Sequence, residues 1–101
     1  MIARMVRVRL PPHRIDEWLA AYREKVRSIH AGAAGLRCHY VLVERDAGQL
    51  VSVGVYESEA AFEAIVASLR RARQDLWEPF GVLPPLESFE VADALDAAMP
   101  G

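Results

Sequence analysis

Cysteine and histidine are scarce in this sequence, which limits the metal and thiol chemistry open to it. Cys38 is the single cysteine, so neither an internal disulfide nor a thiolate metal cluster can form. It has no Cys-His-Asp companion set, and we expect it to serve as a small apolar residue in a sheet. The three histidines, His13, His30 and His39, show no metal-ligand spacing. We therefore predict no metal site and no other cofactor.

An excess of charge, long apolar runs and nucleotide-binding motifs are also lacking. The formal net charge is −2, which gives no general attraction to nucleic acid or to an anionic membrane surface. We see neither a signal-peptide core nor a run of about 18 apolar residues, so we expect a cytoplasmic chain without a membrane segment. Glycine-rich phosphate loops and Ser-His-Asp signatures are missing, which argues against kinase, nucleotide-dependent and hydrolase functions.

The most informative stretch that is present is residues 50–62. Valines at 51, 53 and 55 alternate with other residues as in a strand, and Ser58 then offers a helix N-cap. Phe62 begins a run of apolar residues at helical spacing, so the hydrophobic period changes from 2 to 3.6. The 101 residues are 52% hydrophobic, which is apolar for one small domain and favours association with a second copy.

Patterns along the rest of the chain predict a β-α-β-β-α-β order, which is the α+β ferredoxin-like arrangement with an antiparallel sheet. The expected strands are 2–10, 36–45, 50–56 and 86–91 or 92, and the expected helices are 13–31 and 58–71, with a further helical turn or two over 73–80. The domain should span 1–92, followed by a tail at 93–101. Helices would cover one face of such a sheet, and a second copy is the simplest cover for the other.

The turn between the two central strands sets their register. We prefer a three-residue loop over 46–48 with Gly48 left-handed, which pairs Arg45 with Gln49. Tyr40 would then lie opposite Gly54 and cover it, and Cys38 would lie opposite Tyr56. A slip of one residue would place His39 beside Tyr56 instead.

Two short motifs resemble a known family. Residues 53–62, Val-Gly-Val-Tyr-Glu-Ser-Glu-Ala-Ala-Phe, are similar to the Trp-Glu-Ser-Glu signature of the antibiotic biosynthesis monooxygenase-like group of the dimeric α+β barrel superfamily. Residues 34–37, Ala-Gly-Leu-Arg, look like its Pro-Gly-Phe-Lys/Arg entry to the second strand. The resemblance implies a homodimer with facing sheets and a pocket for a small hydrophobic or aromatic ligand in each subunit. Its members include cofactor-independent oxygenases of aromatic polyketides, haem-degrading enzymes and quinol-type oxygenases.

The sequence departs from this family at positions that matter for function. Tyr56 stands where the family has tryptophan. Haem-degrading members place a histidine ligand late in the second helix, where this chain has Arg70, Arg71, Arg73 and Gln74, and an asparagine near the position of Arg4. We therefore do not expect haem degradation.

Arg73 is the most informative polar candidate for the site. It lies eleven residues after Phe62, close to three helical turns, so a continuous helix would place it on the apolar stripe. There its guanidinium could bind a phenolate or carboxylate, or stabilise a developing oxyanion. A break at Arg70 and Arg71 would instead leave Arg73 on the surface, or in a salt bridge with Asp75 or Glu78.

Aromatic residues and one histidine complete the candidate site. Tyr56, at the family's pocket position, could hydrogen-bond or stack on a ligand, and His39 could act as an acid or base. Tyr40, Trp77 and Tyr22 are candidate substrate-binding aromatics. Four of these residues also have a structural interpretation: Tyr56 and Trp77 in the core, Tyr40 over Gly54, and His39 at a sheet edge or dimer face.

The sequence therefore supports two hypotheses of different class. The first is a cofactor-independent monooxygenase acting on a small aromatic or quinone-like molecule, with Arg73, Tyr56 and His39 as catalytic residues. The second is a non-catalytic small-molecule-binding or interaction module on the same dimeric fold. They differ in whether Tyr56 and Arg73 share one water-accessible cavity.

Overall fold

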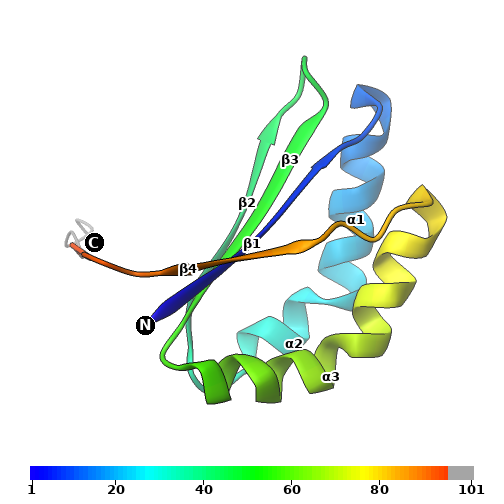
Figure 1. The fold of residues 1–101 in the computed structure, drawn as a ribbon. Helices are drawn as coiled ribbons and strands as arrows, with labels where there is room; N and C mark the ends of the chain where they lie inside the picture. The colour runs from blue at the N-terminus through cyan, green and yellow to red at the C-terminus, as the bar shows by residue number, and fades with distance from the viewer. Residues whose placement is uncertain (96–101) are drawn as a thin grey trace, which may run out of the picture.

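The computed structural model describes residues 1–95, and Figure 1 shows its fold. Of the expected tail, residues 96–101 lie outside the described residues. The order of elements is β1 (Ile2–Arg9), η1 (Pro12–Arg14), α1 (Ile15–Lys25), α2 (Arg27–Ala31), β2 (Leu36–Glu44), β3 (Gln49–Tyr56), α3 (Glu59–Trp77), η2 (Glu78–Phe80) and β4 (Leu86–Glu90). This is the predicted ferredoxin-like α+β fold.

The four strands form one antiparallel sheet in the order β2-β3-β1-β4. Figure 1 shows the helices gathered on one side of this sheet, with the other side bare. Directly paired residues have side chains on the same face of a sheet, so Val6 with Ser52 and Arg4 with Gly54 mark the face toward the helices. The core lies between that face and the helices, where Ile15, Trp18 and Leu50 are almost completely buried.

The predicted register of the central hairpin was wrong by one residue. Glu44 pairs with Gln49, so His39 lies opposite Gly54 and Tyr40 opposite Val53. Four residues rather than three form the loop, because Gly48 docks against the end of β1: the Leu10 amide donates to the Gly48 carbonyl at 2.8 Å. Gly48 has a φ of 67°, as predicted, and a Cβ there would lie 2.1 Å from the Leu10 carbonyl oxygen.

An aromatic ring does cover Gly54, but it belongs to Tyr56 of the same strand. A Cβ built on Gly54 would lie 2.8 Å from the Tyr56 hydroxyl oxygen. Cys38 pairs with Val55 rather than Tyr56, and an irregularity between Leu36 and Cys38 brings Leu36 opposite Tyr56. The corrected register turns the His39 side chain toward the helices, which matters for the site below.

The predicted helix over 13–31 is interrupted at Val26, a buried residue with a φ of −120° that separates α1 from α2. Eight residues of a straight helix span about 12 Å, which would separate Tyr22 from His30 along the axis. The interruption allows α2 to turn back, so that the His30 ring contacts the Tyr22 hydroxyl. A local irregularity thus contributes to the site.

Helix α3 runs without a break through the arginines where a break was considered. Ser58 caps it as predicted, since its hydroxyl oxygen accepts a hydrogen bond from the Ala61 amide at 3.1 Å. Phe62, Ile65, Leu69, Leu76 and Trp77 form its buried stripe. Arg73 therefore lies on the side of α3 that faces the sheet, and the alternative in which a broken helix leaves it on the surface is wrong.

Candidate active site

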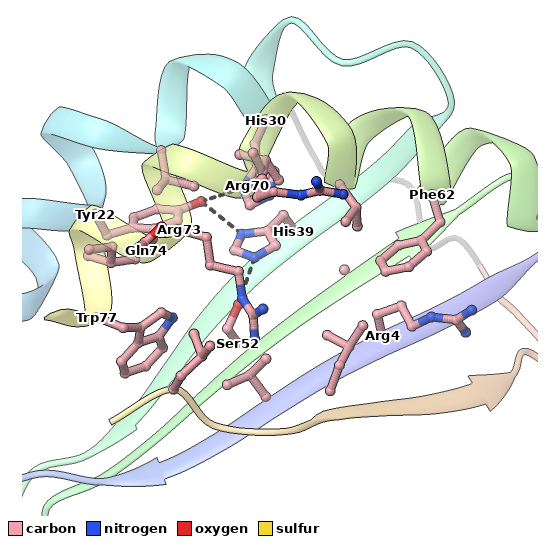
Figure 2. A pocket seen from close by; sticks show the side chains of 18 of the residues that line it. Arg4, Tyr22, His30, His39, Ser52, Phe62, Arg70, Arg73, Gln74 and Trp77 are labelled. Carbon is pink, nitrogen blue, oxygen red and sulfur yellow. Dashed lines mark hydrogen bonds between the residues drawn. The ribbon is translucent and has the colours of Figure 1, made fainter. Parts of the chain in front are cut away.

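A cavity of about 380 Å³ lies between the inner face of the sheet and the three α-helices. Its walls are mainly apolar and aromatic, with contributions from Trp18, Tyr56, Phe62, Leu69 and Trp77. The polar groups on its walls include Arg4, Tyr22, His39, Ser52 and Arg73, all of which are labelled in Figure 2. A concave, mostly apolar space with a few polar groups is the usual form of a small-molecule site, and its volume falls in the ordinary range of about 300–1,000 Å³.

Four side chains on one wall form a continuous hydrogen-bonded chain, drawn with dashed lines in Figure 2. The Ser52 hydroxyl oxygen is 2.8 Å from His39 Nε2, and His39 Nδ1 is 2.9 Å from the Tyr22 hydroxyl oxygen. The same Tyr22 oxygen is 3.0 Å from His30 Nδ1. The chain joins strands β3 and β2 to helices α1 and α2, so four separate elements position it.

Burial keeps this chain uncharged. It lowers the pKa of His39 to about 4, and repulsion from a charged His30 ring, whose centroid is 4.2 Å away, adds to the shift. Burial also lowers the pKa of His30 and raises that of Tyr22. Both imidazoles and the phenol are therefore neutral at pH 7, and each neutral imidazole has one nitrogen that accepts a hydrogen bond.

Arg73 approaches the cavity from α3. One of its NH2 groups donates to the Pro84 carbonyl at 3.0 Å, which ties α3 to the segment before β4. Burial lowers the pKa of Arg73, but a guanidinium remains charged at neutral pH. Asp75, a partner considered from the sequence, instead lies 4.0 Å from Arg71. Of the five donors of the Arg73 guanidinium, this contact uses one.

A second guanidinium belongs to Arg4 at another part of the cavity wall. Its side chain is only 9% exposed and donates to both carboxylate oxygens of Glu59, at 2.6 and 2.7 Å. It also lies over the Phe62 ring at 4.4 Å, and Phe62 meets Tyr56 edge-on at 5.0 Å. Burial raises the pKa of Tyr56, although the Arg4 charge opposes this shift. The Tyr56 phenol is thus a neutral donor beside a fixed positive charge.

The cavity brings together five of the six residues predicted for the site. Arg73, Tyr56, His39, Trp77 and Tyr22 all line it. Tyr40 does not, because the corrected register turns it to the opposite face, where it is 59% exposed. The sequence interpretation did not single out Arg4, Ser52 or His30. Strand alternation could have found the first two, since Arg4 shares a face with Val6 and Ser52 shares one with Leu50.

The low pKa of His39 predicts an acid-sensitive fold. Its pKa is about 4 in the folded chain and 6.5 in the unfolded chain, so between these values the unfolded state binds more protons. Stability should therefore fall as the pH drops from about 6.5 toward about 4. Between about pH 6.5 and about pH 4, the urea concentration at the midpoint of unfolding should fall less for His39→Gln than for the unmodified chain. His13→Gln, at an exposed histidine, should keep the full loss, and equal losses in all three would contradict the assignment.

Within residues 1–95, we find no group of three or more His, Cys, Asp and Glu side chains arranged to hold a metal ion. Over the same residues, no helix combines the length and apolar character that crossing a membrane requires.

Solved structures with the same fold include three informative ones. The chain aligns with Rv0793 from Mycobacterium tuberculosis at a TM-score of 0.76 and 18% identity, covering 94% of this chain and 98% of that one. It aligns with a monooxygenase from the gene ActVA-Orf6 of Streptomyces coelicolor, in complex with the ligand nanaomycin D, at a TM-score of 0.77 and 14% identity, covering 96% and 92%. A protein of unknown function, NE2512 from Nitrosomonas europaea, aligns at a TM-score of 0.65 and 17% identity, covering 97% of this chain and 95% of that one. These identities show the shared fold alone.

Sequence comparison identifies the family. Among curated proteins, none matches the chain significantly. The family described as antibiotic biosynthesis monooxygenase matches residues 1–73, which include β1 to β3 and most of α3. Because this match covers more than half of the sequence, the chain belongs to the antibiotic biosynthesis monooxygenase family.

Proposed function

We propose that this protein is a cofactor-independent monooxygenase that oxidises a small phenolic or quinone-like aromatic molecule in the cavity. The observation that carries the proposal is that Tyr56 and Arg73 line one cavity with aromatic walls. Membership of the family and the fold shared with a monooxygenase bound to nanaomycin D support the same reaction class.

The proposed chemistry uses the reactivity of the substrate itself. An anthrone-type substrate has a CH₂ group beside its aromatic rings, and loss of one proton from it gives an electron-rich anion. This anion reduces O₂ and combines with it to form a peroxide at that carbon. Loss of water from the peroxide leaves a carbonyl. One oxygen atom enters the product, and the other leaves as water together with the two hydrogens that the carbon has lost.

The residues have separate roles in this scheme. Trp18, Trp77 and Phe62 hold the aromatic rings, since apolar and aromatic walls bind such ligands. Arg73 and the Tyr56 phenol donate hydrogen bonds to the oxygen on which negative charge develops. His39 is the acid-base group. Burial keeps its imidazole neutral, so one ring nitrogen can accept a proton while the other donates one.

The active form that we propose is a homodimer built on the bare face of the sheet. Cys38, Tyr40, Leu42, Val51, Val53, Val55 and Met5 share this face through their pairings. Tyr40 and Leu42 are 59% and 53% exposed, and Phe89 of β4 is 46% exposed. Apolar side chains gathered in this way favour a partner surface, and a second copy offers the same surface to a two-fold interface.

Aerobic incubation with an anthrone tests the proposal. We expect the purified chain, treated with a metal chelator and free of flavin, to convert anthrone to the quinone while consuming one O₂ per molecule. Appearance of the quinone absorbance and uptake of O₂ measure the two sides of the reaction. Binding of the anthrone without turnover would favour the non-catalytic binding module instead, and heat-denatured protein supplies the background rate.

A further inference from the structure

All four residues of the hydrogen-bonded chain from Ser52 to His30 line the cavity, and the chain ends at a ring that is not fully buried. Trp18 Nε1 is the one side-chain nitrogen or oxygen within residues 1–95 that is both buried and without a hydrogen-bond partner. His30 is partly buried. Within residues 1–95 its Nε2 has no hydrogen-bond partner, yet it is not one of the fully buried atoms. The Nε2 atom of His30 therefore has some surface of its own, on a residue that lines the cavity.

The hydrogens in this chain can be arranged in two consistent ways. In the first, Ser52 donates to His39 Nε2, His39 Nδ1–H donates to the Tyr22 oxygen, and Tyr22 donates to His30 Nδ1. In the second, all three hydrogen bonds reverse direction. A phenol hydroxyl has one hydrogen, so Tyr22 can donate to only one of its two histidine partners. The two arrangements are thus related by a shift of one proton at each link.

We propose that this chain is a proton relay, in which the proton removed from the substrate at Ser52 moves along the cavity wall to His30. The inference rests on the proposed function, because it assigns the path of the proton in that reaction. It adds Ser52 as the group that contacts the substrate and His30 as the terminal acceptor. His39, already the acid-base group, then acts inside the relay.

Each proton in the relay can be followed. The substrate gives its proton to the Ser52 oxygen, whose own hydrogen passes to His39 Nε2. The hydrogen on His39 Nδ1 passes to the Tyr22 oxygen, and the Tyr22 hydrogen passes to His30 Nδ1. His39 ends neutral in its other tautomer, His30 becomes an imidazolium, and the substrate becomes an anion. Return of the proton along the same path protonates the peroxide before water leaves, which restores the first arrangement.

Burial favours His30 over His39 as the place where the positive charge rests, because it is the main cause that lowers the pKa of His39 to about 4, whereas the pKa of His30 is lowered less. Two imidazolium rings with centroids 4.2 Å apart repel each other, and a charged His30 further lowers the pKa of His39. The Arg27 charge lowers the pKa of Tyr22 against the effect of burial, which makes the phenol at the middle link a stronger hydrogen-bond donor.

Tyr22→Phe is the sharpest test of the relay, because it removes the hydroxyl but keeps the ring that stacks on Trp18. We expect kcat for anthrone to fall on the order of 10²-fold, the usual contribution of a positioned acid or base, with KM nearly unchanged. In mixtures of light and heavy water, a plot of the rate of the unmodified chain against the fraction of deuterium should be curved, because several protons move in the same step. The variant should lose this curvature. A Tyr22→Phe variant with unchanged kcat would overturn the relay.

A binding experiment without oxygen separates failure of the relay from failure of the proposed function. Para-nitrophenol, whose phenolate absorbs at a longer wavelength than its phenol, is added anaerobically while NMR follows the histidine ring nitrogens. We expect phenolate formation together with protonation of His30 in the unmodified chain, and neither in Tyr22→Phe. His13→Gln should behave as the unmodified chain does. Phenolate formation with His30 still neutral would overturn the relay alone, whereas no binding of the phenol would remove the proposed function and the relay together.

Discussion

Replacing Arg73 by methionine is expected to lower kcat for anthrone oxidation by about 10²–10³-fold, the usual effect of removing a donor that stabilises a developing oxyanion. Methionine keeps much of the apolar length of the side chain and removes the guanidinium. The structural reason is that Arg73 lines the cavity while only one of its donors is used by Pro84. The measurement is the steady-state rate of quinone formation, together with anthrone affinity from quenching of tryptophan fluorescence.

Arg71→Met is the matched control for this experiment. It removes the same group from a side chain two residues earlier in α3, which is 93% exposed. Its kcat should stay close to that of the unmodified chain. Arg73→Met also loses the hydrogen bond to Pro84, so its melting temperature should be compared with that of Arg71→Met. An Arg73→Met variant that folds normally and keeps its full rate would remove Arg73 from the catalytic scheme.

The second large effect concerns the bare face of the sheet. We expect the double substitution Tyr40→Glu and Leu42→Glu to convert a dimer into single chains, because both residues would place carboxylates without partners in the interface. Burying an unpaired charge costs several kcal/mol, and each ~1.4 kcal/mol weakens association tenfold. The dissociation constant of the dimer should therefore rise by at least ~100-fold. Light scattering should give twice the 11.2 kDa chain mass before the change and a single mass after it.

A control for this experiment is Val82→Glu, which adds charge at an exposed apolar residue between η2 and β4. It should leave the mass unchanged. The double variant should still fold, since Tyr40 and Leu42 are more than half exposed in the single chain. A single-chain mass for the unmodified protein at micromolar concentration would contradict the proposed dimer directly.

Local patterns were enough to predict the fold. Alternating apolar residues in the strands, the N-cap at Ser58 and the change of period at Phe62 each describe short-range preferences, and the structure confirms the elements that they predict. The same patterns could not predict the register, which depends on how Gly48 docks against Leu10, 38 residues away in the sequence. The incorrect register placed Tyr40 in the site, whereas the four-residue loop of the structure turns Tyr40 to the bare face of the sheet.

The site was predicted in part, for a related reason. Arg73 and Trp77 follow from helical spacing once α3 is continuous, and this continuity was one of two alternatives left open by the arginine-rich segment. His30 could not be predicted, because its contact with Tyr22 requires the interruption at Val26 and the chain there shows no glycine or proline. Ser52 and Arg4 were accessible from strand alternation, yet a single serine or arginine on an inner face gives no chemical signal until its neighbours are known.

The most direct measurement of the central claim uses oxygen labelled with its heavy isotope in the anthrone reaction. The proposed mechanism predicts that each quinone formed gains one labelled oxygen atom from O₂ and that the other labelled atom appears in water, detected by mass spectrometry of both products. The rate of this incorporation should fall with Arg73→Met and stay unchanged with Arg71→Met. Quinone that carries unlabelled oxygen from water, or labelled quinone formed at the same rate by heat-denatured protein, would contradict the account.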